Sequence, residues 1–355
     1  MSHYEFLLGT NYRSSENTRS STLNARRPPA RRTYLVKAFV ASDPKTPPAL
    51  IEVAAPVPES GEVHVKIAAC GLNFADRRLA KGTYQDKHPH PVTLGMELAG
   101  TVLADANGFE AGTRVAVFAG AGGLAEQGVF PADRCVALPD AMPLEVAAGF
   151  QVAYGSSHLA LVKARLVAGE TLLVLGAAGG VGLTAVEIGK LMGARVIACA
   201  RGEKGEVPKR AGADEVLDSD DPDLKAKLKA LGGADVVYDP VGGAGYRTAL
   251  SALQPDGRYL LIGFASGDLP EIAANHLLVK NVSVIGFWWG GYLVSNPAAV
   301  TASLRQLFDW YIEGRLHPHI SIVLPLAHAA EGLELIRSRR ATGKVVIRCD
   351  TLAAL

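Results

Sequence analysis

A glycine-rich run in the middle of the chain, residues 176–182, most constrains what this sequence can fold into. The residues before it, 171–175, form an apolar stretch without helical periodicity, which suits a strand buried on both faces. After it, apolar residues recur at helical spacing from Val181 to Met192, and a second apolar run follows at 196–199. The pattern therefore predicts a βαβ unit, which takes about 30 residues.

The glycine run also resembles a dinucleotide fingerprint, with alanine where the first glycine of the motif usually stands. The second glycine lets the backbone approach a pyrophosphate, and the third lets the helix pack closely on the strand. The helix start then offers unpaired N–H groups to phosphate oxygens. A purely structural turn is the alternative, but the strand–turn–helix context favours a cofactor. We expect the cofactor to contact Ala177, Ala178, Gly179, Gly180, Val181 and Gly182.

Length and charge set the broad class of the protein. A chain of 355 residues is long enough for about two domains. Its 36 basic and 35 acidic residues are interspersed, so we expect neither nucleic acid nor a membrane as the main partner. The four cysteines are far apart and lie mostly in apolar runs, which predicts buried free thiols in a reducing, cytoplasmic location.

Residues 1–34 differ in composition from the rest of the chain, because they are rich in Ser, Asn, Thr and Arg. Such a segment buries too little apolar surface to order itself, so we expect a disordered extension over residues 1–35. An organelle transit peptide is the alternative, although Glu5 and Glu16 count against it. We favour an inert extension, with the functional protein beginning near Val36.

Two patterns fill the remaining chain. Short strand candidates separated by Pro- and Gly-bearing turns predict a β-barrel-like domain up to about Phe150, and a mostly helical stretch leads out of it. Alternating strands and helices then predict a doubly wound parallel sheet, and the last elements are too few for a third domain, so we expect them to return to the first one. The expected strands are 37–40, 49–53, 62–69, 98–103, 114–117, 215–217, 235–238, 258–263, 282–286, 320–324 and 344–348. The expected helices are 143–160, 204–211, 224–231, 245–253, 272–279, 298–313 and 327–337.

The end of the second strand of the βαβ unit bears on the choice of cofactor. An NAD enzyme usually has a carboxylate there for the ribose 2′-hydroxyl, but this chain has Arg201 and then Lys204. A guanidinium suits a phosphate because its planar fork binds two oxygens. A solvated basic turn is the alternative. We therefore predict NADPH rather than NADH.

Several separate motifs resemble the zinc-free quinone oxidoreductase (zeta-crystallin-like) branch of the medium-chain dehydrogenase/reductase superfamily. The resemblance extends over nearly everything from Val36 onward. The motifs are Cys70-Gly-Leu-Asn-Phe-Ala-Asp76, Lys81-Gly-Thr-Tyr84, Gly95-Met-Glu-Leu-Ala-Gly-Thr-Val102, Asp239-Pro-Val-Gly-Gly243 and Thr342-Gly-Lys-Val-Val346.

The resemblance implies an α/β protein with two domains. A GroES-like β-barrel-type catalytic domain would occupy 36–155 and be completed by 289–355, and a Rossmann domain with a doubly wound parallel sheet would occupy 156–288. It nominates Tyr84 and Asn73 as hydrogen-bond donors to the acceptor oxygen or as groups that position the nicotinamide. A packing aromatic and a turn residue are the alternatives. Further cofactor contacts implied are Val152, Gly263, Phe264, Ala265, Phe287, Trp288 and Lys344.

The same resemblance predicts a site without metal. Zinc-dependent relatives carry Cys where this chain has Asn73, and His where it has Met96, so Glu97 alone cannot hold the ion. Without a Lewis acid to ionise an alcohol, hydride delivery to an electron-poor acceptor is favoured.

The sequence therefore predicts an NADPH-dependent reductase of a quinone or a conjugated carbonyl compound, acting as a homodimer. An enoyl-thioester or 2-alkenal reductase would use the same fold and hydride donor. A hypothesis of another class is a non-catalytic NADPH-binding protein with a crystallin-like or RNA-binding role, against which the balanced charge counts.

Overall fold

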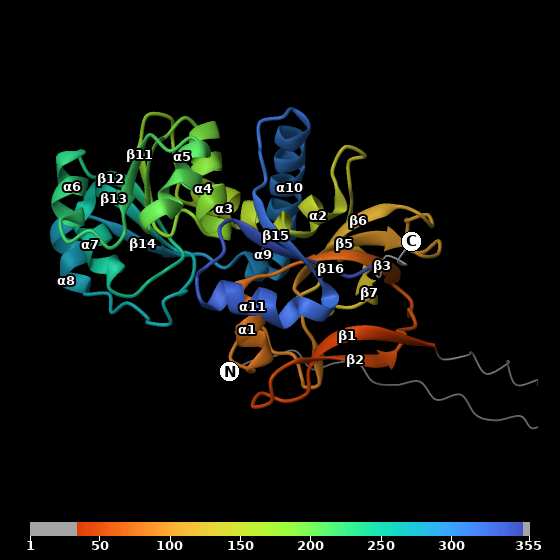
Figure 1. The fold of residues 1–355 in the computed structure, drawn as a ribbon. Coiled ribbons are helices and arrows are strands. Elements are labelled where there is room, and N and C mark those ends of the chain that lie inside the picture. The colour runs from red at the N-terminus through yellow and green to blue at the C-terminus, as the bar shows by residue number, and fades with distance from the viewer. Residues whose placement is uncertain (1–33, 351–355) are drawn as a thin grey trace, which may run out of the picture. The chain divides into compact units, whose positions relative to one another are not determined.

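The glycine-rich loop follows the central strand β9 of a six-stranded sheet, of which Figure 1 labels β11, β12, β13 and β14. The structure, a computed structural model, describes residues 34–350. All neighbouring strands of this sheet are parallel, in the order β11-β10-β9-β12-β13-β14, which is that of a doubly wound Rossmann sheet. Its strands are β9 (Thr171–Val174), β10 (Arg195–Ala200), β11 (Glu215–Asp218), β12 (Ala234–Asp239), β13 (Leu253–Leu261) and β14 (Ser283–Gly286).

Helical segments connect these strands. The first, α4, packs on strands whose side chains are almost entirely buried, as expected for a sheet covered on both faces. The segments are α4 (Gly180–Leu191), η2 (Gly202–Gly205), α5 (Glu206–Arg210), α6 (Leu224–Ala230), α7 (Gly245–Ala252) and α8 (Ala274–Lys280).

The remaining strands form two further, mainly antiparallel sheets. One has the order β15-β16-β3-β5-β6-β8, with β7 also paired to β3, and the other has the order β2-β1-β4. Strand β16 pairs with β3, so the chain returns to its first sheet, as the sequence predicted. The strands are β1 (Leu35–Ala41), β2 (Ala49–Ala54), β3 (Glu62–Gly71), β4 (Val92–Thr93), β5 (Glu97–Val102), β6 (Arg114–Phe118), β7 (Gln127–Pro131), β8 (Cys135–Ala137), β15 (Ile320–Pro325) and β16 (Lys344–Arg348).

The helices associated with these sheets include α3, which packs against both α4 and α10 in one continuous apolar core. These helices are α1 (Phe74–Ala80), α2 (Leu144–Ala148), α3 (Gln151–Lys163), α9 (Trp289–Ser295), α10 (Pro297–Ile312) and α11 (Ala329–Arg337), with short 3₁₀ turns η1 (Ala132–Arg134) and η3 (Leu326–His328). Within residues 34–350, no helix is both long and apolar enough to cross a bilayer.

Several boundaries differ from the sequence-based expectation. The helix expected over 143–160 is two helices, separated at Gly149 and Phe150. The helix expected over 204–211 is a 3₁₀ turn followed by the short α5. Helices α1 and α9 and strands β4, β7 and β8 were not predicted, because they are short and two of them, β7 and α9, contain glycine or proline. The expectation of disorder over residues 1–33 lies outside the described residues, and Leu35 already belongs to β1.

Candidate functional site

Four polar residues from distant parts of the chain meet beside the glycine-rich loop, and we call them the polar corner. Asn73 precedes α1 and Asp76 lies in its first turn, Glu97 begins β5, and Lys344 begins β16. Asp76 and Glu97 are completely buried, and Lys344 is 7% exposed. Burial of three charged groups is tolerated only where each is paired and hydrogen-bonded.

For Lys344 and Glu97, the bonds within the polar corner satisfy that requirement. Lys344 Nζ donates to Glu97 Oε1 at 2.8 Å, to Asn73 Oδ1 at 2.9 Å and to the Leu72 carbonyl at 2.8 Å. Asn73 Nδ2 donates to Glu97 Oε1 at 2.9 Å and to the Gly71 carbonyl at 3.3 Å. All three ammonium protons of Lys344 and the amide of Asn73 are therefore used inside the protein.

Asp76 fixes the backbone on either side of this corner. Its carboxylate accepts from the backbone N–H of Asn73 at 2.7 Å and from that of Gly95 at 3.1 Å. Burial raises the pKa of Asp76 to about 7, although both backbone hydrogen bonds act to lower it. The second Glu97 oxygen accepts from the backbone N–H of Val152 at 2.9 Å, so the corner also holds the start of α3.

Tyr84 lies close to the polar corner. Its hydroxyl oxygen accepts a 3.2 Å hydrogen bond from Trp288 Nε1, and no residue among 34–350 accepts its proton. Burial raises the pKa of Tyr84, and the nearby Asp76 carboxylate adds to the effect. The phenol therefore stays protonated around neutral pH and is able to donate a hydrogen bond.

The glycine-rich loop is joined directly to the polar corner. The Gly343 N–H donates to the Ala178 carbonyl at 2.8 Å, and Gly343 forms an isolated parallel bridge with Gly179. Lys344 follows at once, so one short segment connects the loop with the buried ammonium group. No side chain caps α4 at Gly179, which leaves the first-turn N–H groups available to an anion. A Cβ on Gly182 would lie 2.3 Å from the Gly176 carbonyl oxygen, so only glycine fits there.

Three exposed or half-buried cations gather after β10 and α11, and we call Arg201, Lys204 and Arg339 the cationic end. Lys204 Nζ donates to the backbone carbonyl of Arg339, and Arg339 donates to the Ala265 carbonyl at 3.3 Å. Partial burial and the nearby guanidinium of Arg201 lower the pKa of Lys204. Sequence reasoning missed Arg339, which lies 135 residues after Lys204 in a positive-φ turn.

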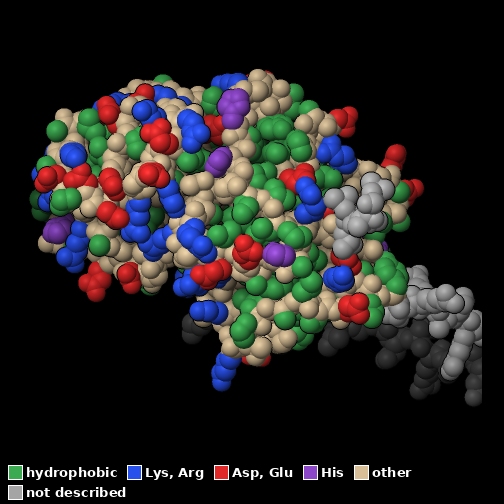
Figure 2. All heavy atoms as spheres, viewed as in Figure 1, with side chains coloured by type: hydrophobic (Ala, Val, Ile, Leu, Met, Phe, Trp, Pro, Cys, Tyr) green, Lys and Arg blue, Asp and Glu red, His purple; other side chains and the backbone are tan. Residues whose placement is uncertain are grey.

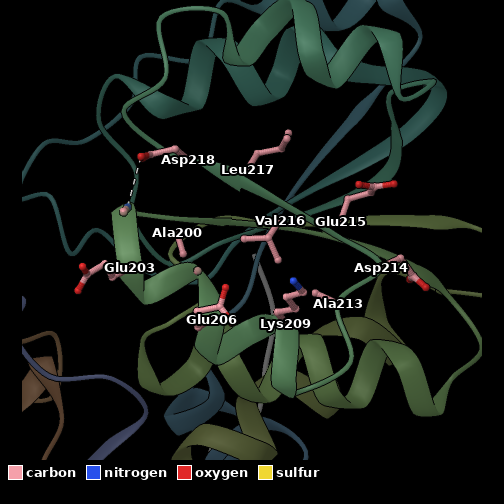
Figure 3. Close-up of a pocket in the computed structure, with 12 residues that line it drawn as sticks. Ala200, Glu203, Glu206, Lys209, Ala213, Asp214, Glu215, Val216, Leu217 and Asp218 are labelled. Atoms are coloured by element: carbon pink, nitrogen blue, oxygen red, sulfur yellow. Dashed lines mark hydrogen bonds between the residues drawn. The ribbon is translucent and has the colours of Figure 1, made fainter.

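A carboxylate from beyond the neighbouring strand reaches the cationic end. Arg201 Nε donates to Asp220 Oδ1 at 3.1 Å, and both side chains are more than half exposed. A dashed line in Figure 3 joins Asp218 to the backbone N–H of Gly202. Asp218 ends β11, the neighbour of β10, and Asp220 follows it, so inspection of β10 alone could not find them.

A hollow of about 450 Å³ lies between α5 and β11 (Figure 3). Arg201 and Lys204 do not line it, and five of its six charged side chains are acidic, so it does not suit a phosphate. The residues that line it are Ala200, Gly202, Glu203, Gly205, Glu206, Lys209, Ala213, Asp214, Glu215, Val216, Leu217 and Asp218.

Of the other residues named from the sequence, two bond to these groups. Val152 is tied to the polar corner, and Ala265 to the cationic end. Gly263 and Phe264 follow β13, the Phe264 ring lies beside Gly242, and buried Phe287 donates its N–H to the Leu261 carbonyl. Sequence reasoning missed Asp76, and Glu97 entered only as an insufficient zinc ligand.

The described residues contain no group of three or more His, Cys, Asp or Glu side chains arranged to hold a metal ion. Met96, which stands where zinc-dependent relatives have histidine, is a buried apolar side chain.

The chain matches two protein-family descriptions. Residues 59–140 match the alcohol dehydrogenase GroES-like domain, and residues 180–310 match the zinc-binding dehydrogenase family. Quinone oxidoreductase-like protein 2 of Bos taurus is 36% identical over 310 residues, which cover 84% of this chain and 89% of that protein.

Two solved structures are similar to this fold. The quinone oxidoreductase of Thermus thermophilus, also solved as its complex with NADPH, matches with a TM-score of 0.79 and 34% identity, covering 88% of this chain and 99% of the other. The Escherichia coli quinone oxidoreductase in complex with NADPH matches with a TM-score of 0.81 and 26% identity, with the same coverage. The chain therefore belongs to the zinc-free quinone oxidoreductase branch of the medium-chain dehydrogenase/reductase superfamily, which confirms the resemblance of its motifs.

Proposed function

We propose that this member of the quinone oxidoreductase branch is an NADPH-dependent reductase that delivers hydride to a quinone or conjugated carbonyl compound without zinc. The observation that carries the proposal is the junction at Gly343, where the glycine-rich loop meets the polar corner. It brings a phosphate-binding loop next to Asn73, beside which Tyr84 offers a free hydroxyl proton.

NADPH fits the residues around the loop. The uncapped first turn of α4 and the close packing at Gly182 match a pyrophosphate, and the cationic end matches a 2′-phosphate. When bound, NADPH supplies the hydride. The complexes of two similar quinone oxidoreductases with NADPH support this cofactor.

We assign different roles to the two residues nominated as donors. Asn73 has its amide protons engaged with Glu97 and Gly71, so it shapes the site rather than binding the acceptor oxygen. Tyr84 has its proton free and a raised pKa, so it is the donor that meets negative charge developing on that oxygen.

The same corner supports independence from zinc. The side chain that stands where a zinc-binding cysteine would be, Asn73, is bonded to Lys344, and an ammonium group at that place repels a cation. This supports reduction of an already electron-poor acceptor over oxidation of an alcohol.

We also infer which parts of the chain form each domain. Residues 36–155 with 289–355 would form the catalytic domain, and residues 156–288 would form the cofactor domain.

Within the described chain, β14 is the last strand of its sheet, and the neighbouring α8 exposes Leu278 and Val279 by 77% and 79%. An unpaired sheet edge beside apolar side chains suits pairing with a second copy, which supports a homodimer.

The test is a panel of acceptors. NADPH oxidation is measured with 1,4-benzoquinone, with a simple enone and with a crotonyl thioester. We expect turnover with the quinone or the enone. Faster turnover of the thioester would favour an enoyl-thioester reductase, and tight NADPH binding without turnover of any acceptor would refute the enzyme and support a non-catalytic cofactor-binding protein.

A further inference from the structure

Two adjacent tryptophans follow β14, and they have opposite surroundings. Trp289 is 4% exposed and packs edge-on against Phe118, with ring centroids 4.8 Å apart. Trp288 is 42% exposed and meets Tyr84 edge-on, with centroids 6.4 Å apart and planes at 85°. Trp288 is therefore the one of this pair that contacts the proposed donor.

The direction of the hydrogen bond between them constrains the tyrosine proton. An indole N–H only donates, so Tyr84 Oη is the acceptor at 3.2 Å. The phenol proton consequently points away from Trp288. It has no acceptor among the described residues, which leaves it for a bound molecule.

Two glycines leave the space in which the Trp288 ring packs. A Cβ on Gly290 would lie 2.9 Å from Trp288 Nε1, and one on Gly291 would lie 2.8 Å from its Cε3. Both contacts are closer than packed atoms tolerate, so a side chain at either position would displace the indole. Each glycine also costs α9 about 1 kcal/mol relative to alanine, and the ring contact explains their presence.

We propose that Trp288 is a positioning residue: its indole, seated on Gly290 and Gly291, holds Tyr84 so that the phenol proton faces the oxygen of the acceptor. The proposal rests on the proposed function for the role of Tyr84, and on the structure alone for the geometry. It differs from a packing role, in which Trp288 would only fill space, and from a cofactor contact, in which it would change the affinity for NADPH.

The geometry is testable without any turnover. The chain has three tryptophans, so protein labelled with ¹⁵N-tryptophan gives three indole N–H signals, and Trp288→Phe assigns one of them. We expect Tyr84→Phe and Gly291→Ala each to shift that signal, while the matched control Trp310→Phe leaves it in place. A Trp288 signal that stays unchanged in Tyr84→Phe would overturn the hydrogen bond, whatever the enzyme does.

Kinetics then test the role. In quinone reduction we expect Trp288→Phe to lower kcat about tenfold, a fraction of what a general acid contributes, with the KM for NADPH unchanged. Because Trp288 acts through Tyr84, the double variant with Tyr84→Phe should be no slower than Tyr84→Phe alone. If the losses in kcat of the two single variants multiply in the double variant, or if only the KM for NADPH changes, the positioning role is refuted.

The two proposals fail in distinguishable ways. A wild-type protein that turns over no acceptor refutes the proposed function, and the indole shifts still decide the geometry. Full activity of Trp288→Phe in a protein that does reduce quinones refutes the positioning role alone. Gly290→Ala is a second variant that displaces the Trp288 ring, like Gly291→Ala. Because alanine is favourable in a helix, we expect this variant to fold.

Discussion

The polar corner and the cationic end hold charge in opposite ways. In the polar corner the charged groups are buried and the Lys344 ammonium is bonded entirely within the protein. At the cationic end Arg201 is more than half exposed, and its partner Asp220 is exposed as well. Figure 2 shows acidic and basic side chains interspersed over the surface of this view. The first arrangement stabilises one fixed geometry, whereas the second stays free to meet a charged ligand.

The largest expected effect follows from breaking the buried pair. Lys344→Met leaves the Glu97 carboxylate buried without its cation, which should destabilise the fold by about 3–5 kcal/mol. Urea unfolding at neutral pH measures this change. The matched control at the cationic end, Lys204→Met, should cost at most about 0.5 kcal/mol. Equal losses in the two variants would remove the contrast between the regions.

The contrast also explains which parts of the site the sequence could predict. The glycine-rich loop was predictable because strand, turn and helix are neighbours in the chain, so local periodicity is sufficient. The polar corner was not, since Lys344 meets Asn73 across 271 residues and only the return of β16 to β3 brings them together. The motif resemblance implies that Lys344 contacts the cofactor, which stays a prediction; in the structure its ammonium group bonds to Leu72, Asn73 and Glu97.

At the cationic end, too, the sequence did not reveal contacts between residues that lie far apart in the chain. Arg201 and Lys204 were visible after β10, but Asp220 reaches Arg201 from beyond the neighbouring strand and Arg339 reaches Lys204 from beyond α11.

Helix α9 was missed for a local reason, because Gly290 and Gly291 oppose helix formation. Their explanation is a local contact with the ring of Trp288, the N-cap residue of α9, which no periodicity reveals.

A smaller effect is expected from pH. The Asp76 carboxyl ionises near pH 4 in the unfolded chain, whereas burial raises its pKa to about 7 in the folded protein. Between these values the folded protein holds a proton that the unfolded chain has lost. Stability from this group is therefore complete below about pH 4 and is lost as pH rises toward 7, at roughly 1 kcal/mol per pH unit.

Asp76→Asn tests that dependence by comparison with the wild type. The amide does not titrate, so the difference in unfolding free energy between the two proteins should change steadily from pH 4 to 7. Denaturant unfolding at half-unit pH steps provides the measurement. A constant difference would mean that Asp76 is ionised in the folded protein throughout, and that the polar corner does not respond to pH.

The next effect concerns cofactor binding at the cationic end rather than stability. Arg201→Ala with Lys204→Ala should raise the KM for NADPH about tenfold or more, since charge-assisted hydrogen bonds to a phosphate contribute about 1.5–3 kcal/mol. The KM for NADH should change little, because that cofactor lacks the 2′-phosphate. Equal changes with both cofactors would refute the phosphate role.

Asp220→Asn provides the opposite change at the same place. The variant removes a negative charge and frees the Arg201 guanidinium, with which Asp220 is paired at 3.1 Å. We expect the KM for NADPH to fall about twofold, as suits an exposed pair worth less than 1 kcal/mol, and the gain to vanish at high salt. A rise in that KM would show that Asp220 holds Arg201 in its binding position, so the cationic end would then be organised by a fixed ion pair, as the polar corner is.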